Sequence, residues 1–549
     1  MNILQNILDS PNHKDRQLWA ALFILMAVTL LVYAVSFFNG FVRDDEVIIV
    51  NNPQTLSLQN IPDVLLTPDV IKPYYRPLNR ATYLLDYRIA GMNPAWYHGI
   101  NIAIHGGNVL LLYLLCRRLF PDRTAALIAA LLFAVHPANS EAINFISARN
   151  TILALFFSLA SLLAFMRARD QGRRWPLFSA LLFFCGLLSK ETAFMLVVVI
   201  ALYTAIPLPG QERREEGRGR YAILLPYLLA LVVYFIMRTY SLHGLVGASI
   251  PATGLLDRLY QNVTIIPQYL LLLFVPVDLT IYHTADPRTG FFALPGAVLG
   301  IWLAMLAGLW LLYRKGTGAT FFGLAWCVVN YAPIANIIPI PADSITERFL
   351  YLPAAGFFIM IGSLLNGLAL QKRWKYQYWT AVAAVLIAFA ILTVQRSLDW
   401  RDEITLNTSG VTNNPASASA HYNLGTALRD RGDLAGAVHE WRRALELDPT
   451  NSDSLIQMGT FYAMQGDLSK AEEYYRAALR APLGIADADK SMAYFNLGKI
   501  REKQGQPQKA LEYYETFLKL VPVQYEEYRT EGERRIAQIR AGAARERIK

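Results

Sequence analysis

Long apolar runs, separated by short polar segments, fill roughly the first 400 residues of the chain. A helix needs about 20 apolar residues to cross the hydrocarbon core of a bilayer, and most of these runs approach that length. The runs at 124–137 and 176–189 are shorter, so we expect their ends to be broken or buried within a helix bundle. We predict an all-α polytopic membrane domain over residues 1–400, with about eleven spans at residues 18–38, 98–116, 124–137, 151–168, 176–189, 193–208, 221–239, 291–313, 319–340, 349–370 and 379–397.

The apolar segment 255–279 is treated separately, because Pro267 and Pro276 would interrupt a straight helix. Counting it as a further crossing would move the basic residues that follow it, from Arg314 onward, to the other side of the membrane. We therefore predict a hairpin or re-entrant pair that starts and ends on the outer side.

Lys and Arg cluster in alternate connections between the predicted spans. Because cytoplasmic loops are enriched in basic residues, this pattern places the N-terminus in the cytoplasm and the C-terminal segment on the outer side. The first run is longer than the core of a signal peptide, so we interpret 18–38 as a retained anchor. The basic connections contain Arg117, Arg118 and Arg123, then Arg167, Arg169, Arg173 and Arg174, then Arg213, Arg214, Arg218 and Arg220, then Arg314 and Lys315, then Lys372, Arg373 and Lys375.

The composition also indicates a membrane protein. Of the 549 residues 54% are hydrophobic, and a mean hydropathy of +0.28 is too apolar for a soluble protein of this size. The net charge of +9 follows from the basic cytoplasmic loops, so we do not interpret it as nucleic-acid binding. Cys116, Cys185 and Cys327 all lie in apolar runs, which predicts small core residues and excludes a disulfide framework.

From about residue 412 the sequence becomes soluble and helical, and it repeats. Gly425, Gly459 and Gly498 mark the same position at spacings of 34 and then 39 residues. This is the tetratricopeptide period, with five extra residues near 483–489. We predict a solenoid of three repeats over 412–549, ending in a charged capping helix, whose concave face would bind a peptide or protein. Later in each repeat, one position holds alanine and another holds an aromatic residue. The alanines are Ala437, Ala471 and Ala510, and the aromatic residues are Trp441, Tyr475 and Tyr514.

Charged side chains also collect against the outer ends of the predicted spans, where they are costly and therefore functional candidates. The large first outer loop, 39–97, opens with Asp44 and Asp45. One carboxylate of such a pair could accept a proton from an attacking hydroxyl while its neighbour orients a ligand or a metal. An apolar groove lined by Lys and Arg suits a lipid phosphate. The other candidates on this side are Arg76, His136, Glu141, Arg149, Lys190, Glu191, Glu347 and Arg348.

Two interpretations stay open at this point. His136 stands alone before Pro137, where a structural hydrogen bond is a more common role than a ligand contact. The eight histidines show no zinc-site spacing, and no phosphate-binding loop, nucleophile elbow or dinucleotide fingerprint is present. The sequence leaves open whether a divalent metal takes part.

The order of these motifs resembles a known family. Phe-x-x-Asp-Asp, ending at Asp45, follows the first span, and the set continues with Tyr75-Arg76-Pro77-Leu78, Asn93-Pro94-x-x-Tyr97-His98-x-x-Asn101-x-x-x-His105, Phe133-Ala134-Val135-His136-Pro137-x-x-x-Glu141-Ala142, Ser189-Lys190-Glu191 and Glu347-Arg348-x-Leu350-Tyr351-Leu352-Pro353. Together with the repeat array, this set resembles the transmembrane-and-tetratricopeptide O-mannosyltransferases and their bacterial relatives, within the GT-C glycosyltransferase superfamily. The eukaryotic relatives usually carry more repeats than three.

The resemblance implies a polyprenyl-phosphate-linked sugar as donor and an inverting transfer to an acceptor on the outer side. It implies that Asp44 is the base and Asp45 its supporting partner, although the two roles could be reversed. The residues implied to hold the donor phosphate are Lys190, Arg348, Arg149 and Arg76, and those implied to shape the sugar and acceptor pocket are His136, Glu141, Glu191, Glu347 and His98.

We therefore predict a membrane protein O-glycosyltransferase whose repeat array docks the acceptor protein on the periplasmic side. The compact array and the lack of an organelle signal favour a bacterial inner membrane over an endoplasmic reticulum. The alternative is a non-catalytic membrane scaffold whose repeats recruit partners for envelope or filament assembly.

Overall fold

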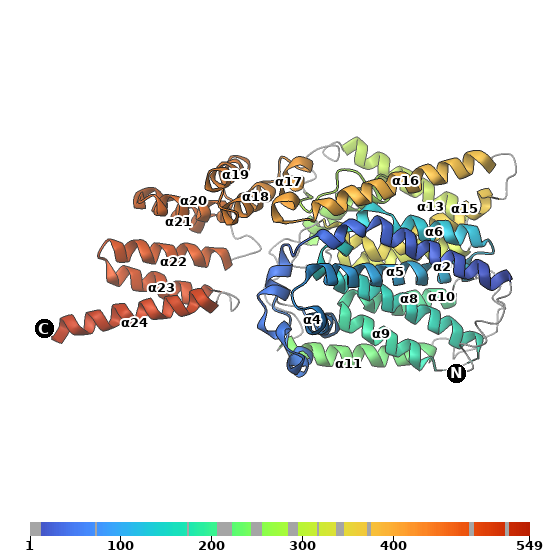
Figure 1. The fold of residues 1–549 in the computed structure, drawn as a ribbon, viewed down its shortest axis with the longest axis horizontal. Coiled ribbons are helices and arrows are strands. Elements are labelled where there is room, and N and C mark those ends of the chain that lie inside the picture. The colour runs from blue at the N-terminus through green and yellow to red at the C-terminus, as the bar shows by residue number, and fades with distance from the viewer. Residues whose placement is uncertain are drawn as a thin grey trace. The chain divides into compact units, whose positions relative to one another are not determined.

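The computed structural model describes residues 13–71, 74–172, 175–205, 222–242, 255–283, 295–315, 318–335, 345–369, 375–481, 488–521 and 526–548. These residues form helices and turns without a strand, which confirms the all-α fold class (Figure 1). The chain divides into two compact units, Met1–Asp402 and Glu403–Lys549, and each is described by itself.

The first unit is a bundle of helices that run side by side (Figure 1). A helix lies in each of the eleven predicted ranges. In lipid, an apolar segment has to pair its backbone N–H and C=O groups with one another, and a helix does so within one segment. These helices are α2 (His13–Val32), α5 (Pro94–Leu119), α6 (Arg123–Ala134), α8 (Arg149–Asp170), α9 (Leu177–Ser189), α10 (Leu196–Ala205), α11 (Leu225–Leu242), α13 (Pro295–Lys315), α14 (Gly318–Tyr331), α15 (Tyr351–Ala369) and α16 (Lys375–Asp399).

The number of spans is not confirmed. Within the described residues, five helical segments are long and apolar enough to cross a membrane, or six if one bent pair counts as a span. That pair, Arg123–Ala134 and Pro137–Asn144, bends by 53°, so the short run at 124–137 is broken as expected. The other apolar helical segments within the described residues are 10–17 residues long, which is shorter than a crossing needs.

Helix α12 (Leu255–Phe274) corrects the prediction of a hairpin at 255–279. It is a single helix with Pro267 inside it. A proline has no amide hydrogen, so the carbonyl of Val263 loses its partner within the helix. The indole Nε1 of Trp302 on α13 donates to that carbonyl at 3.0 Å. The neighbouring helix thus replaces the missing hydrogen bond, and the chain continues as a helix past the proline.

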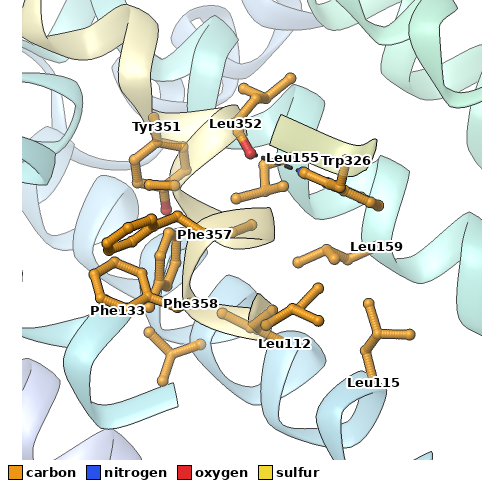
Figure 2. Packing of buried hydrophobic residues seen from close by; sticks show 14 of the residues in the cluster. Leu112, Leu115, Phe133, Leu155, Leu159, Trp326, Tyr351, Leu352, Phe357 and Phe358 are labelled. Carbon is orange, nitrogen blue, oxygen red and sulfur yellow. Dashed lines mark hydrogen bonds between the residues drawn. The ribbon is translucent and has the colours of Figure 1, made fainter. Parts of the chain in front are cut away.

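Aromatic side chains fill the core of the first unit beside α15, as Figure 2 shows. The ring centroids of Phe133 and Tyr351 are 5.3 Å apart, and those of Phe357 and Phe358 are 5.1 Å apart. These tilted and edge-to-face pairs add to the free energy gained by burying the rings.

Helices α14 and α15 approach so closely that their backbones touch. A Cβ on Gly323 would lie 2.6 Å from the carbonyl oxygen of Gly356, so neither position has room for a side chain. Small residues of this kind allow tight packing between helices in lipid. The pair is also tied by Trp326, whose Nε1 donates to the carbonyl of Leu352 at 2.8 Å (Figure 2). This packing fixes the start of α15, next to the segment that carries Glu347 and Arg348.

The first outer loop folds into short helices, including α3 (Ile61–Leu66), and one longer helix, α4 (Pro77–Ala90). Arg80 of α4 is buried and donates to the carbonyls of Val64, Thr67 and Pro68. A guanidinium presents five donors, so one side chain can satisfy several carbonyls at the end of a short helix. The loop is therefore an ordered structure, and it gives the residues around Asp44 and Arg76 fixed surroundings.

The second unit consists of helix pairs, which confirms the repeat array. Its helices are α17 (Glu403–Asn413), α18 (Ala418–Asp430), α19 (Leu434–Leu447), α20 (Ser452–Met464), α21 (Leu468–Arg480), α22 (Ala488–Lys503), α23 (Pro507–Leu520) and α24 (Glu526–Ile548). The five extra residues predicted near 483–489 fall largely outside the described residues.

The repeat landmarks meet in space. A Cβ on Gly459 would lie 2.7 Å from the ring of Tyr475, so the aromatic residue of the second helix occupies the space above the glycine of the first. The other two repeats show the same contact, between Gly425 and Trp441 and between Gly498 and Tyr514. The periodic glycine and aromatic positions are therefore the packing contacts within each helix pair.

Candidate active site

Asp45 is buried and its carboxylate accepts three hydrogen bonds. Oδ1 accepts from the backbone N of Ser147 at 2.7 Å and from the Ser147 hydroxyl, and Oδ2 accepts from the backbone N of Val42 at 3.2 Å. The pKa of Asp45 is raised to about 7, because the effect of burial outweighs that of the hydrogen bonds from Ser147, which lower the pKa. Asp45 thus joins the first outer loop to the short helix η6 (Ile146–Ala148) that precedes α8.

Asp44 differs from its neighbour. Its side chain is only half-buried. Within the part of the chain that the structure describes, no donor contacts its carboxylate. Of the two acidic residues, Asp45 is occupied by structural hydrogen bonds, and the Asp44 carboxylate accepts none from the described residues. This difference favours Asp44 as the base and Asp45 as its support.

Two arginines from distant segments are held by carboxylates. Arg76, at the start of α4, pairs in bidentate fashion with Glu191, with Nε–Oε2 at 3.1 Å and Nη2–Oε1 at 2.7 Å. Arg348, in the short helix η11 (Glu347–Leu350), pairs with the buried Glu141 at 2.6 Å and also donates to it through its backbone N at 3.1 Å. Glu141 and Glu191, predicted for the sugar pocket, therefore orient the two guanidinium groups.

Lys190 lies at the C-terminal end of α9, and its Nζ donates to the hydroxyl of Thr151 at 2.7 Å. The pKa of Lys190 is lowered to about 7, mainly by burial and also by the charges of Arg76 and Arg348, while Glu191 and Glu141 act in the opposite direction. Three cations and two carboxylates therefore gather here, which leaves an excess of one positive charge when Lys190 is protonated. Such a cluster can accept an anion.

Tyr74 connects Asp44 with this cluster. The guanidinium of Arg76 lies over the Tyr74 ring, 3.9 Å from its centroid. Burial raises the pKa of Tyr74, and the charges of Arg76, Glu191, Arg348 and Asp44 all act on it. The phenol therefore lies among the acidic and basic candidates. The structure brings Asp44, Arg76, Lys190 and Arg348 into one region, although they are spread over some 300 residues of sequence.

Arg149 is enclosed in a network of buried hydrogen bonds. It is fully buried and forms an ion pair with Asp86. Its Nε donates to Oδ1 of Asn101 at 2.7 Å, Nη1 to the hydroxyl of Thr82 at 3.1 Å and Nη2 to the carbonyl of Tyr97 at 3.2 Å. These contacts bind α8 to α4 and α5, so we assign Arg149 a structural role.

The two histidines predicted for the pocket also make structural hydrogen bonds. Nε2 of His98 lies 3.3 Å from the carbonyl oxygen of Gly40, and Nε2 of His136 lies 3.1 Å from that of Leu273. Both rings are buried. His136 satisfies a carbonyl near the end of α12, where the helix itself supplies no donor. These contacts favour the structural alternative for His136, and the pocket role of His98 stays a prediction.

Glu347 is buried directly beside Arg348. Its Oε1 accepts from Nε2 of His283 at 3.1 Å, and its Oε2 lies 3.4 Å from Nη2 of Arg396. A buried carboxylate with two such partners is stabilised where it lies, so Glu347 helps to hold the segment that contains Arg348. Its place in the sugar pocket stays a prediction.

Several residues of the site were missed by sequence reasoning. Ser147, Thr151 and His283 each contact a predicted residue, but serine and threonine next to a predicted span carry no distinguishing signal. Tyr74 could have been found, since it directly precedes the motif that contains Arg76. Among the described residues, no group of three or more His, Cys, Asp or Glu side chains is placed to hold a metal ion.

Comparison with known proteins gives matches in both units. Residues 98–240 match the family model of dolichyl-phosphate-mannose-protein mannosyltransferases. Residues 418–451 and 450–521 match models of the tetratricopeptide repeat.

Curated relatives carry the same combination. The chain is 27% identical over 514 residues to human protein O-mannosyl-transferase TMTC1, covering 80% of this chain and 56% of that protein. It is 27% identical over 463 residues to the Caenorhabditis elegans protein O-mannosyl-transferase F38B6.6, covering 80% and 65%. It is 24% identical over 567 residues to human protein O-mannosyl-transferase TMTC3, covering 93% and 61%. The chain thus spans about three fifths of the length of these relatives. These matches confirm that the chain resembles the transmembrane-and-tetratricopeptide O-mannosyltransferases in both its membrane unit and its repeats.

Proposed function

We propose that this protein is a membrane glycosyltransferase that moves a sugar from a polyprenyl-phosphate-linked donor to hydroxyl groups of an acceptor protein. The observation that carries the proposal is the contrast between two neighbouring carboxylates. Asp45 is held by Ser147 and Val42, while Asp44 accepts no hydrogen bond from the described residues and acts on Tyr74 together with Arg76 and Arg348. The relatives, which are protein O-mannosyltransferases by name, support the same activity.

In the proposed reaction, Asp44 accepts the proton of the acceptor hydroxyl. The oxygen attacks the anomeric carbon of the sugar, and the bond between that carbon and the phosphate oxygen breaks, so the configuration inverts. The leaving group is the polyprenyl phosphate, which carries away the bonding electrons as negative charge. Arg76, Lys190 and Arg348 stabilise this charge as it develops.

The two arginines are held by carboxylates before the donor arrives. A guanidinium that is already oriented loses little side-chain entropy when it binds phosphate. The Glu141 and Glu191 contacts also balance the buried positive charge in the absence of the donor. Arg348 keeps part of its side chain exposed and can turn its free donors toward a phosphate.

The repeat unit would bind the acceptor and raise its concentration near Asp44. The proposed location is a bacterial inner membrane, with the N-terminus in the cytoplasm and the Asp44 loop and repeats facing the periplasm. The basic connections that precede α12 support this orientation of the N-terminus and of the Asp44 loop.

The direct test is transfer by the purified full-length protein in lipid nanodiscs. A polyprenyl-phosphate mannose with a radiolabelled sugar would be mixed with periplasmic protein extract from a strain that lacks this protein. We expect labelled protein to accumulate, and mass spectrometry to place the hexose on Ser, Thr or Tyr. Absence of label, together with absence of hydrolysis of this donor or its glucose analogue, would contradict the proposal and favour the scaffold alternative.

The lowered pKa of Lys190 predicts how donor binding depends on pH. In the free enzyme Lys190 loses its charge as the pH rises through about 7, so phosphate binding above that value requires uptake of a proton. We expect the donor KM to rise by up to about tenfold per pH unit above 7, with little change below it. A Lys190→Arg variant keeps its charge and should show a flat profile. The same rise in the Lys190→Arg variant would assign the pH effect to another group.

A further inference from the structure

The short segment Leu279–His283, which follows α12, contacts the surroundings of Asp44. The hydroxyl of Tyr282 accepts a hydrogen bond from Nη1 of Arg43 at 3.0 Å. The guanidinium of Arg43 also lies 5.6 Å from the centroid of the Tyr282 ring. Tyr282 is buried, so this contact is shielded from solvent. Arg43 directly precedes Asp44, and its side chain is therefore fixed from a segment about 240 residues away.

The next residue of the same segment reaches the surroundings of Arg348. Nε2 of His283 donates to Oε1 of Glu347 at 3.1 Å, and Glu347 directly precedes Arg348. Adjacent side chains of one segment thus hold the neighbour of the proposed base and the neighbour of a proposed phosphate ligand.

The backbone at this junction is unusual. Arg43 has a φ of +54° and Asp278 a φ of +52°, and they are the non-glycine residues with positive φ in the described part of the chain. Residues other than glycine rarely adopt this conformation, although Asp does so more readily than Arg, and for Arg43 it persists only where surrounding contacts enforce it. Arg43 lies beside Asp44. Asp278 directly precedes the segment Leu279–His283, whose Tyr282 contacts Arg43.

Asp44 is therefore fixed from both sides along the chain. On one side Arg43 is held by Tyr282, and on the other Asp45 is held by Ser147. The Asp44 carboxylate itself has no donor among the described residues, so its position depends on these two neighbours. The position of a catalytic group strongly affects the rate of the chemical step, since a displacement of about 1 Å can lower that rate about 100-fold.

We propose that Tyr282 and His283 are positioning residues that set the separation between the base Asp44 and the phosphate-binding Arg348. The inference rests on the proposed glycosyl transfer and adds residues that neither the motifs nor the relatives point to. Tyr282 acts on the base through Arg43, and His283 acts on Arg348 through Glu347. Neither residue is assigned a contact with a substrate.

The test compares Tyr282→Phe and His283→Ala in the full-length protein, in the nanodisc assay with polyprenyl-phosphate mannose. Tyr282→Phe keeps the ring and removes only the hydroxyl. We expect kcat to fall about 10- to 100-fold, with the donor KM within about twofold, since a misplaced base affects only the chemical step. His283→Ala should raise the donor KM about tenfold with a smaller change in kcat. His283→Gln, whose amide can donate to Glu347, should recover most of the donor affinity.

Tyr376→Phe serves as the matched control, because Tyr376 is 85% exposed on α16. It should leave kcat, KM and the melting temperature unchanged. An active wild-type protein with unchanged kcat in Tyr282→Phe and unchanged donor KM in His283→Ala would overturn the inference. The inference would also be overturned if kcat and donor affinity fell equally in both variants and the melting temperature fell with them. That result would indicate a merely structural role. A wild-type protein without transfer would instead refute the proposed function.

Discussion

Asp44→Asn is expected to reduce sugar transfer by about 10²- to 10⁴-fold, the range by which a positioned general base accelerates a reaction. Asparagine has nearly the same shape as aspartate but cannot accept the proton of the acceptor hydroxyl. Because the Asp44 carboxylate accepts no hydrogen bond from the described residues, the change should leave the fold intact. The donor KM should change little, since the phosphate is bound by the cations. The measurement is kcat and KM in the nanodisc assay, alongside membrane insertion and melting temperature.

The matched control is Asp63→Asn, in α3 of the same outer loop. Asp63 is exposed, so its loss should not affect transfer. Asp45→Asn tests the opposite assignment, because its carboxylate is held by Ser147 and Val42. Normal transfer by Asp44→Asn would refute the base role, and loss of transfer in Asp45→Asn alone, at an unchanged melting temperature, would reverse the two roles.

Arg149→Met is expected to destabilise the membrane unit by about 3–5 kcal/mol, because it leaves the buried Asp86 carboxylate without its partner. The variant also removes hydrogen bonds to Asn101, Thr82 and Tyr97. The melting temperature in detergent should fall clearly. The double variant Arg149→Met with Asp86→Asn should recover part of the loss, since it removes the unpaired charge.

Arg118→Met provides the comparison, because Arg118 and Asp170 also join α5 to α8. That pair is exposed, with 38% and 61% of the side chains accessible, and a pair of this kind contributes up to about 1 kcal/mol. The same experiment tests the original phosphate assignment. If Arg149 bound the donor, Arg149→Met would raise the donor KM at an unchanged melting temperature, and the structural role would be wrong.

The scaffold alternative predicts a different pattern of phenotypes. If only the repeats mattered, the variants at Asp44 and Lys190 would behave as wild type in cells, while deletion of 403–549 would not. If the protein is an enzyme, Asp44→Asn should match the deletion strain in the glycosylation of its acceptor.

Local properties of the chain were predictable. The helix positions follow from the length of each apolar run, because a helix satisfies its own backbone hydrogen bonds. The repeats follow from a period in the sequence, and Gly459 and Tyr475 do meet as the pattern indicates. Candidate residues such as Asp44, Arg76, Lys190 and Arg348 were found because charge is costly near lipid. The number of crossings was less predictable, since several helices are shorter than the bilayer requires.

The sequence by itself determined the all-helical class, the repeat array and the set of charged candidates, since these depend on composition and spacing within short windows. Only the tertiary structure decided how each candidate is used. Asp45 is held by Ser147, 102 residues away, and Pro267 is tolerated because Trp302 of the next helix supplies a hydrogen bond. Arg149 and Arg76 look alike as basic residues near a span, but one is enclosed with Asp86 while the other lies with Tyr74 and Glu191. Burial and hydrogen-bond partners set the role of a charged group, and both arise from segments that meet only when the chain is folded.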